Sequence, residues 1–214
     1  IPGHSLGADW LVHRSLIPPV RMKQGGRHNH CPTSPIYREK CRIINTKLAE
    51  RYGKHPMLAF WHISNEYNAA CECDLCRAAF REWLKKKYKT LDNLNHSWWT
   101  PFWSHTFSDW EEIDAIDVSI CSMRVDFHRF KSEQVMDFYK AEVAALKAIT
   151  PDIPVTTNFM EGPFYDLDFW KWAPELDVAS WDAYPQYHEP AVYNRALAIQ
   201  FSLHHDLFRS LKGG

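Results

Sequence analysis

Short apolar runs alternate with helical segments along this 214-residue chain, and this alternation limits its fold more than any other feature. The apolar runs have the length and flanking residues of buried strands, and they cover residues 57–63, 155–159 and 178–181. Four helices are expected from the pattern of apolar residues, over residues 34–53, 77–88, 125–149 and 189–211. Strands that alternate with helices form parallel sheets, so an α/β fold is expected.

Polar or aromatic residues follow each expected strand at its carboxyl end. Asn65 and Glu66 follow the first strand, Asn158 lies in the second, and Trp181 ends the third. Functional residues at the carboxyl ends of successive strands are typical of a (β/α)8 barrel. A doubly wound sheet also fits, but it usually carries a glycine-rich phosphate loop, which is absent here. Three strands cannot close a barrel, so the chain is expected to cover only part of one.

Charge and hydropathy exclude two kinds of partner. The formal net charge is −1, so no strong field exists to attract nucleic acid or an anionic membrane. The sequence has neither eighteen consecutive apolar residues nor a signal peptide, which predicts a cytoplasmic protein.

Aromatic residues make up 14% of the chain. Aromatic rings beside polar groups are typical of sugar-binding sites, although a core rich in tryptophan explains the same composition.

Three cysteines lie within six residues, at Cys71, Cys73 and Cys76. Thiolates at this spacing wrap around one tetrahedral metal ion, and a fourth ligand then comes from elsewhere. Cys31 is the first choice for the fourth ligand, with His28 or His30 as the alternatives. Four thiolates leave no open position for water, so a structural zinc ion is expected in a region formed by residues 27–31 and 71–76. The two other thiols, Cys41 and Cys121, are expected to be free and buried.

Asn65 and Glu66 form a pair that suits glycoside hydrolysis. That reaction uses one carboxylic acid to protonate the leaving oxygen and a second carboxylate at the anomeric carbon. An adjacent asparagine amide binds the sugar 2-hydroxyl in such sites. The dipeptide alone is a weak signal, and a surface glutamate is the simpler interpretation of it.

The wider sequence resembles the glycoside hydrolase family 42 β-galactosidases, which are retaining (β/α)8-barrel enzymes. The resemblance extends over nearly all 214 residues, in order. The segments that carry it are residues 26–32 (GRHNHCP), 34–39 (SPIYRE), 61–67 (WHISNEY), 71–76 (CECDLC), 102–104 (FWS), 157–160 (TNFM) and 180–185 (SWDAYP).

This resemblance implies a role for each candidate residue. Glu66 matches the catalytic acid/base that follows the fourth barrel strand. The matching substrate-site residues are Arg27, Asn65, Trp103, Asn158 and Trp181. The family's zinc ligands match Cys31, Cys71, Cys73 and Cys76. Core packing is the alternative for the two tryptophans, and a loop salt bridge is the alternative for Arg27.

The resemblance also implies what residues 1–214 lack. They would form the central part of the catalytic domain, with barrel strands four to six, whereas the family's nucleophile follows strand seven. Glu161 is the best local substitute, but nothing in the sequence favours it.

The implied substrate is a terminal β-D-galactoside, and the implied assembly is a homotrimer. The alternative is a zinc-stabilised carbohydrate-binding or scaffold protein without catalysis, while a zinc hydrolase conflicts with four thiolate ligands.

Overall fold

Three short parallel strands form the sheet of this protein, seen in a computed structural model that describes residues 30–68, 71–114, 119–160, 167–185 and 191–213. The strands are β1 (Trp61–His62), β2 (Val155–Phe159) and β3 (Val178–Trp181), in the order β1-β2-β3. In the register, Trp61 pairs with Val155 and Asn158 with Ser180. The predicted parallel sheet is therefore confirmed.

The first strand is shorter than predicted. We expected residues 57–63, but only two residues form β1. Met57 is 81% exposed and Phe60 is 50% exposed, so the apolar side chains before Trp61 are not buried in the sheet. Backbone hydrogen bonds hold the strand at its two ends, from Trp61 N to Pro154 O (2.8 Å) and from Ile63 N to Thr156 O (2.8 Å).

Helices connect and cover these strands. The α-helices are α2 (Pro35–Tyr52), α3 (Asp74–Tyr88), α4 (Leu91–Trp98), α5 (Cys121–Lys147), α6 (Phe169–Trp172) and α7 (Ala191–Ser210). Short 3-10 turns lie at η1 (Phe102–Ser104), η2 (Trp110–Glu112) and η3 (Ala173–Glu175). The Ser34 hydroxyl accepts a hydrogen bond from Tyr37 N at the start of α2, which confirms the predicted cap. None of the described helices is long and apolar enough to span a membrane.

One helix was missed in the sequence, and one prediction of burial is wrong. The α4 helix was not predicted, because eight residues are too few to show a clear period. Cys121 was expected to be buried, but it is the first residue of α5 and is exposed. Cys41 is buried in α2, as predicted.

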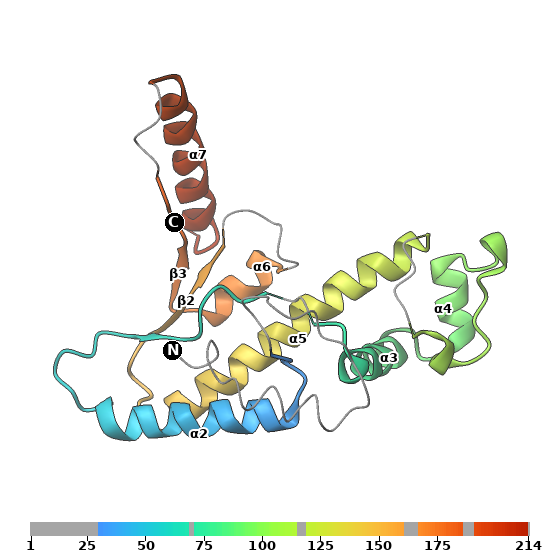
Figure 1. The fold of residues 1–214 in the computed structure, drawn as a ribbon, viewed down its shortest axis with the longest axis horizontal. Coiled ribbons are helices and arrows are strands. Elements are labelled where there is room, and N and C mark those ends of the chain that lie inside the picture. Colours follow the sequence, from blue (N-terminus) through green and yellow to red (C-terminus); the bar gives the residue numbers. More distant parts are fainter. Residues whose placement is uncertain (1–29, 69–70, 115–118, 161–166, 186–190, 214) are drawn as a thin grey trace.

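The long helix α5 contributes side chains to two apolar clusters, one along each half of the helix. Its carboxyl-terminal half packs against α2, and its residues Val135, Phe138 and Leu146 belong to one apolar cluster with residues of the sheet and of α7. Its amino-terminal half packs with α3 and α4 through Phe127 and Phe130. Figure 1 shows α3 and α4 at the end of α5 that lies away from the sheet. The sheet and the α3–α4 region are thus held together by one helix.

A buried carboxylate holds the α3–α4 end in place. Asp126 of α5 accepts hydrogen bonds from Lys87, from the Tyr88 hydroxyl (2.5 Å) and from Trp98 Nε1 (3.1 Å). Burial disfavours the charged form, but these hydrogen bonds outweigh it and lower the pKa of Asp126. The ionised side chain therefore joins α3, α4 and α5.

Candidate active site and cysteine cluster

The carboxyl ends of all three strands meet at the side chain of Asn158. Its amide oxygen accepts a hydrogen bond from the backbone N–H of Glu66 (3.1 Å). Its amide nitrogen donates to Asn65 Oδ1 (3.1 Å) and to Asp182 Oδ1 (2.6 Å). One buried side chain on β2 therefore joins the residues that follow β1 to the residue that follows β3.

Glu66 lies at a backbone turn after β1. Its φ angle is 49°, and Ser64 has a φ angle of 54°, so two residues in three adopt the left-handed region. This region costs about 1–2 kcal/mol for each residue with a side chain, so neighbouring contacts must hold the turn. The Glu66 side chain is 3% exposed. A buried carboxyl group at a strained turn beyond a barrel strand is typical of a catalytic group.

One face of the sheet near Glu66 is polar. Strand residues alternate between two faces, and the register places Asn158 beside Ser180. Asp182 follows Ser180 by two residues and so lies on the same face, where it meets Asn158. Asp182 was not among the residues predicted for the site. Alternate residues of a strand lie on the same face, so the spacing of two residues between Ser180 and Asp182 was the signal that could have placed Asp182 in the site.

A second buried contact supports the residue that follows Glu66. The Tyr67 hydroxyl donates a hydrogen bond to Glu142 Oε2 on α5, and both side chains are buried. Burial raises the pKa of Glu142 to about 7, and the Tyr67 hydrogen bond only partly offsets this effect. Tyr67 also packs its ring against Phe138 and Trp172. The turn that carries Glu66 is thus anchored to the sheet on one side and to α5 on the other.

The raised pKa of Glu142 predicts a pH-dependent stability. In the unfolded chain the group loses its proton near its ordinary pKa of 4.5, whereas in the folded protein it keeps the proton up to about pH 7. Between these values the folded state binds more protons, so its stability falls as the pH rises, by about 3 kcal/mol in total. Glu142→Gln should remove this slope in urea unfolding measured from pH 4.5 to 7. The exposed variant Glu50→Gln should keep the slope, and an unchanged slope in Glu142→Gln would contradict the assignment.

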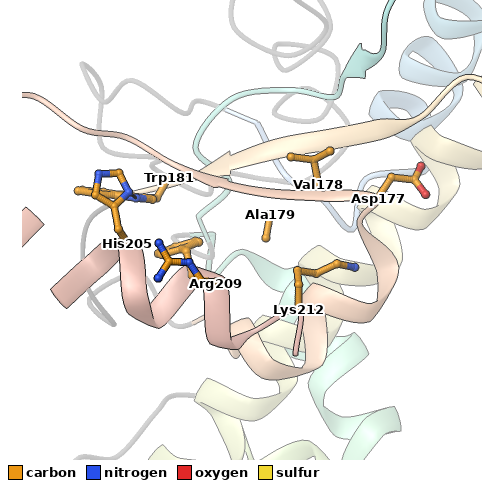
Figure 2. Close-up of a pocket in the computed structure, with 8 residues that line it drawn as sticks. Asp177, Val178, Ala179, Trp181, His205, Arg209 and Lys212 are labelled. Atoms are coloured by element: carbon orange, nitrogen blue, oxygen red, sulfur yellow. Dashed lines mark hydrogen bonds between the residues drawn. The ribbon is translucent and has the colours of Figure 1, made fainter. Parts of the chain in front are cut away.

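The two predicted tryptophans make their ring contacts with other parts of the chain. Trp181 faces α7, where its ring stacks on His204 at 4.9 Å between centroids and its Nε1 lies 3.4 Å from His205 Nδ1. Figure 2 shows Trp181 and His205 at one end of a hollow between β3 and α7. Trp103 is 70% exposed on η1, in the α3–α4 region. Arg27 and Glu161 lie outside the described residues, so their predicted roles stay predictions.

Four cysteines come together in a second site, as the sequence predicted. The Sγ atoms of Cys31, Cys71, Cys73 and Cys76 all lie within 4.8 Å of one another, and none forms a disulfide. The Cys31–Cys73 and Cys31–Cys76 Sγ distances are both 3.6 Å, and the Cys73–Cys76 distance is 3.8 Å. A tetrahedral zinc ion with bonds of about 2.3 Å separates its sulfur ligands by about 3.8 Å. The cluster therefore has the chemistry and the size of a four-thiolate zinc site.

The surroundings of the cluster also suit a negatively charged metal centre. The Thr33 hydroxyl lies 3.3 Å from Cys76 Sγ, and Gln134 Nε2 donates to that hydroxyl at 3.0 Å. Lys131 lines the same small cavity as Cys71 and Cys76. Cys73 is the N-cap residue of α3, so the positive end of the helix dipole lies at the cluster. His30, an alternative ligand, stacks on Tyr37 instead, and His28 lies outside the described residues.

The sequence and the fold of this chain are similar to those of known proteins. The model of glycoside hydrolase family 42, described as β-galactosidase, matches residues 18–214. The chain is 53% identical to the β-galactosidase BglY of Alicyclobacillus acidocaldarius, over 89% of this chain and 28% of that protein. It is 51% identical to the β-galactosidase GanA of Bacillus subtilis, over 90% of this chain and 30% of that protein. The crystal structure of a β-galactosidase from Rahnella sp. R3 is similar, with a TM-score of 0.82, 47% identity, and coverage of 89% of this chain and 28% of that one.

These similarities identify the class of protein. The chain belongs to glycoside hydrolase family 42, the β-galactosidase family. The predicted fold class, a partly covered (β/α)8 barrel, is confirmed. The chain spans about 30% of the length of the relatives named above.

Proposed function

We propose that this chain provides the acid/base part of a retaining β-galactosidase that hydrolyses terminal β-D-galactosides, with Glu66 as the acid/base. The observation that carries the proposal is the position of Glu66, a buried carboxyl group just beyond a barrel strand and held by Asn158. The names of the relatives support the choice of substrate. Asn65 is next to Glu66 in the chain, and we propose that its amide binds the 2-hydroxyl of the galactose.

The proposed reaction has two steps. A carboxylate attacks the anomeric carbon while Glu66 gives its proton to the glycosidic oxygen, so the leaving alcohol departs neutral and a galactosyl–enzyme forms. Glu66, now ionised, then takes a proton from water, and the resulting attack releases galactose with its original configuration. We propose that the attacking carboxylate comes from the part of the family's length that this chain does not cover.

We also propose that the four cysteines hold a structural zinc ion. Four thiolates fill its coordination sphere, so the ion supplies no activated water and no catalytic step. Its contribution is to tie Cys31, which lies just before α2, to the loop between Glu66 and α3. A metal ion would bind these four side chains as thiolates.

A full-length chimera tests the proposed function. In it, residues 18–214 of this chain replace the matching segment of GanA from Bacillus subtilis. We expect the chimera to hydrolyse nitrophenyl β-D-galactoside, and the isolated 214-residue chain to be inactive because its second carboxylate is missing. A folded but inactive chimera would favour the carbohydrate-binding or scaffold alternative. Activity of the isolated chain that Glu66→Gln abolishes would place a second carboxylate within this chain.

Two further expectations stay predictions. A trimeric chimera is expected from the family, and light scattering of the purified protein would check it. The cytoplasmic location likewise stays a prediction. Neither expectation affects the chemistry proposed for Glu66.

A further inference from the structure

We infer that Asn158 is a positioning residue that aims Glu66, and not a side chain that binds the sugar. This inference rests on the proposed role of Glu66 as acid/base. It differs from the prediction made from the sequence, in which Asn158 was a substrate-binding residue. The Asn158 amide already makes three hydrogen bonds within the protein, and this observation argues against sugar binding.

The amide of Asn158 has no N–H left for a ligand. An asparagine side chain carries two N–H donors and one oxygen acceptor. Both donors are used, one on Asn65 Oδ1 and one on Asp182 Oδ1, and the oxygen receives the Glu66 N–H. The side chain is also 9% exposed. A sugar hydroxyl would have to displace a protein partner to reach it.

The chemistry of the partners fixes the orientation of this amide. The backbone N–H of Glu66 can only donate, so it requires the oxygen of Asn158. The carboxylate of Asp182 accepts when ionised, so it requires the nitrogen. A flipped amide would put oxygen against oxygen at Asp182 and N–H against N–H at Glu66. Asp182 therefore holds Asn158 in the one orientation that supports Glu66.

This support acts where the backbone is strained. The regular ladder between β1 and β2 reaches the Ile63 N–H, which donates to Thr156 O, and the chain then enters the left-handed conformation at Ser64. Beyond Ser64, the Glu66 N–H donates to the Asn158 oxygen and ties the turn to β2. Loss of this contact would let the turn relax and move the carboxyl group of Glu66 away from the leaving oxygen. A displacement of about 1 Å in such a group costs about 100-fold in rate.

The substitution Asn158→Asp in the chimera tests the inference. The new carboxylate can still accept the Glu66 N–H, but it cannot donate to Asp182 and repels its charge. We compare kcat/KM for lactose, whose leaving group needs a proton, with kcat/KM for dinitrophenyl galactoside, whose leaving group needs none. We expect the lactose value to fall about 100-fold and the dinitrophenyl value to fall less than about threefold. Both substrates carry the same galactose, so loss of a sugar contact or of folded protein would lower both values equally.

A double variant restores the hydrogen bond between positions 158 and 182 with the donor and the acceptor exchanged. In Asn158→Asp with Asp182→Asn, the amide at 182 donates to the carboxylate at 158, which still accepts the Glu66 N–H. We expect this double variant to recover at least about tenfold of the lost lactose activity. Asn93→Asp, the same change at an exposed asparagine of α4, should leave both substrates unaffected.

Two outcomes overturn the inference. One is an equal fall for both substrates in Asn158→Asp, and the other is no recovery in the double variant. Glu66→Gln, measured in parallel, separates this failure from failure of the proposed function. If Glu66→Gln shows the selective loss on lactose and Asn158→Asp does not, the role of Asn158 alone is wrong. If Glu66→Gln shows no selective loss, the role of Glu66 is wrong and that of Asn158 falls with it.

Discussion

Replacing Glu66 with glutamine in the full-length chimera should lower kcat/KM for lactose by about 100- to 10,000-fold. Glutamine has nearly the same shape, so the turn and its hydrogen bond to Asn158 should stay in place. It cannot give a proton to the leaving oxygen. The loss should therefore depend on the leaving group, and dinitrophenyl galactoside, which departs without a proton, should be cleaved with a nearly unchanged kcat/KM.

A matched variant controls for the change of charge. Glu39→Gln removes an exposed carboxylate on α2 that pairs with Arg42 at 2.7 Å, remote in sequence from the site. It should leave kcat/KM unchanged for both substrates. A Glu66→Gln enzyme that cleaves lactose at the normal rate would show that Glu66 is not the acid.

Replacing Cys73 with serine should have the largest effect on stability. Cys73 is buried and contacts the thiols of Cys31 and Cys76. A structural zinc ion bound by four thiolates contributes about 10–16 kcal/mol of apparent binding free energy at neutral pH. Losing one thiolate should abolish stoichiometric zinc binding and lower the melting temperature by at least about 10 °C.

Zinc content and thermal unfolding check this prediction together. The purified chain should contain one zinc ion for each polypeptide, and a chelator should lower its melting temperature as Cys73→Ser does. Cys121→Ser is the matched control, because Cys121 is exposed and lies outside the cluster. The structural role would be contradicted if the purified chain contained no zinc and if neither the chelator nor the Cys73→Ser change lowered its melting temperature.

The sequence predicted the elements whose signals are local. The helices at α2 and α5 and the strands β2 and β3 have clear apolar patterns, and the structure has them near the expected bounds. The α4 helix is too short to show a period, so it was missed. The overlong prediction for β1 arose because apolar residues such as Met57 lie exposed before the strand. Burial is a tertiary property that a short apolar run does not encode.

The candidate site was predictable only in part, for a similar reason. The spacing of Cys71, Cys73 and Cys76 predicted a cluster of thiols, and Cys31, the predicted fourth member, lies in it. The roles of Asn158 and Asp182 depend on the pairing of strands that are distant in sequence. The Tyr67–Glu142 contact joins residues 75 positions apart, and no local pattern marks it. Such contacts between distant residues require the three-dimensional structure.

The most direct test of the role of Glu66 is azide rescue of a Glu66→Ala chimera. With dinitrophenyl galactoside this variant should form the galactosyl–enzyme but hydrolyse it slowly, because no base remains to activate water. Azide fits the space left by the carboxyl group and needs no base. We predict that azide raises the turnover rate and yields β-galactosyl azide, with the configuration retained. Formation of the α-azide would instead identify Glu66 as the nucleophile, and no effect of azide would contradict its assignment as the acid/base.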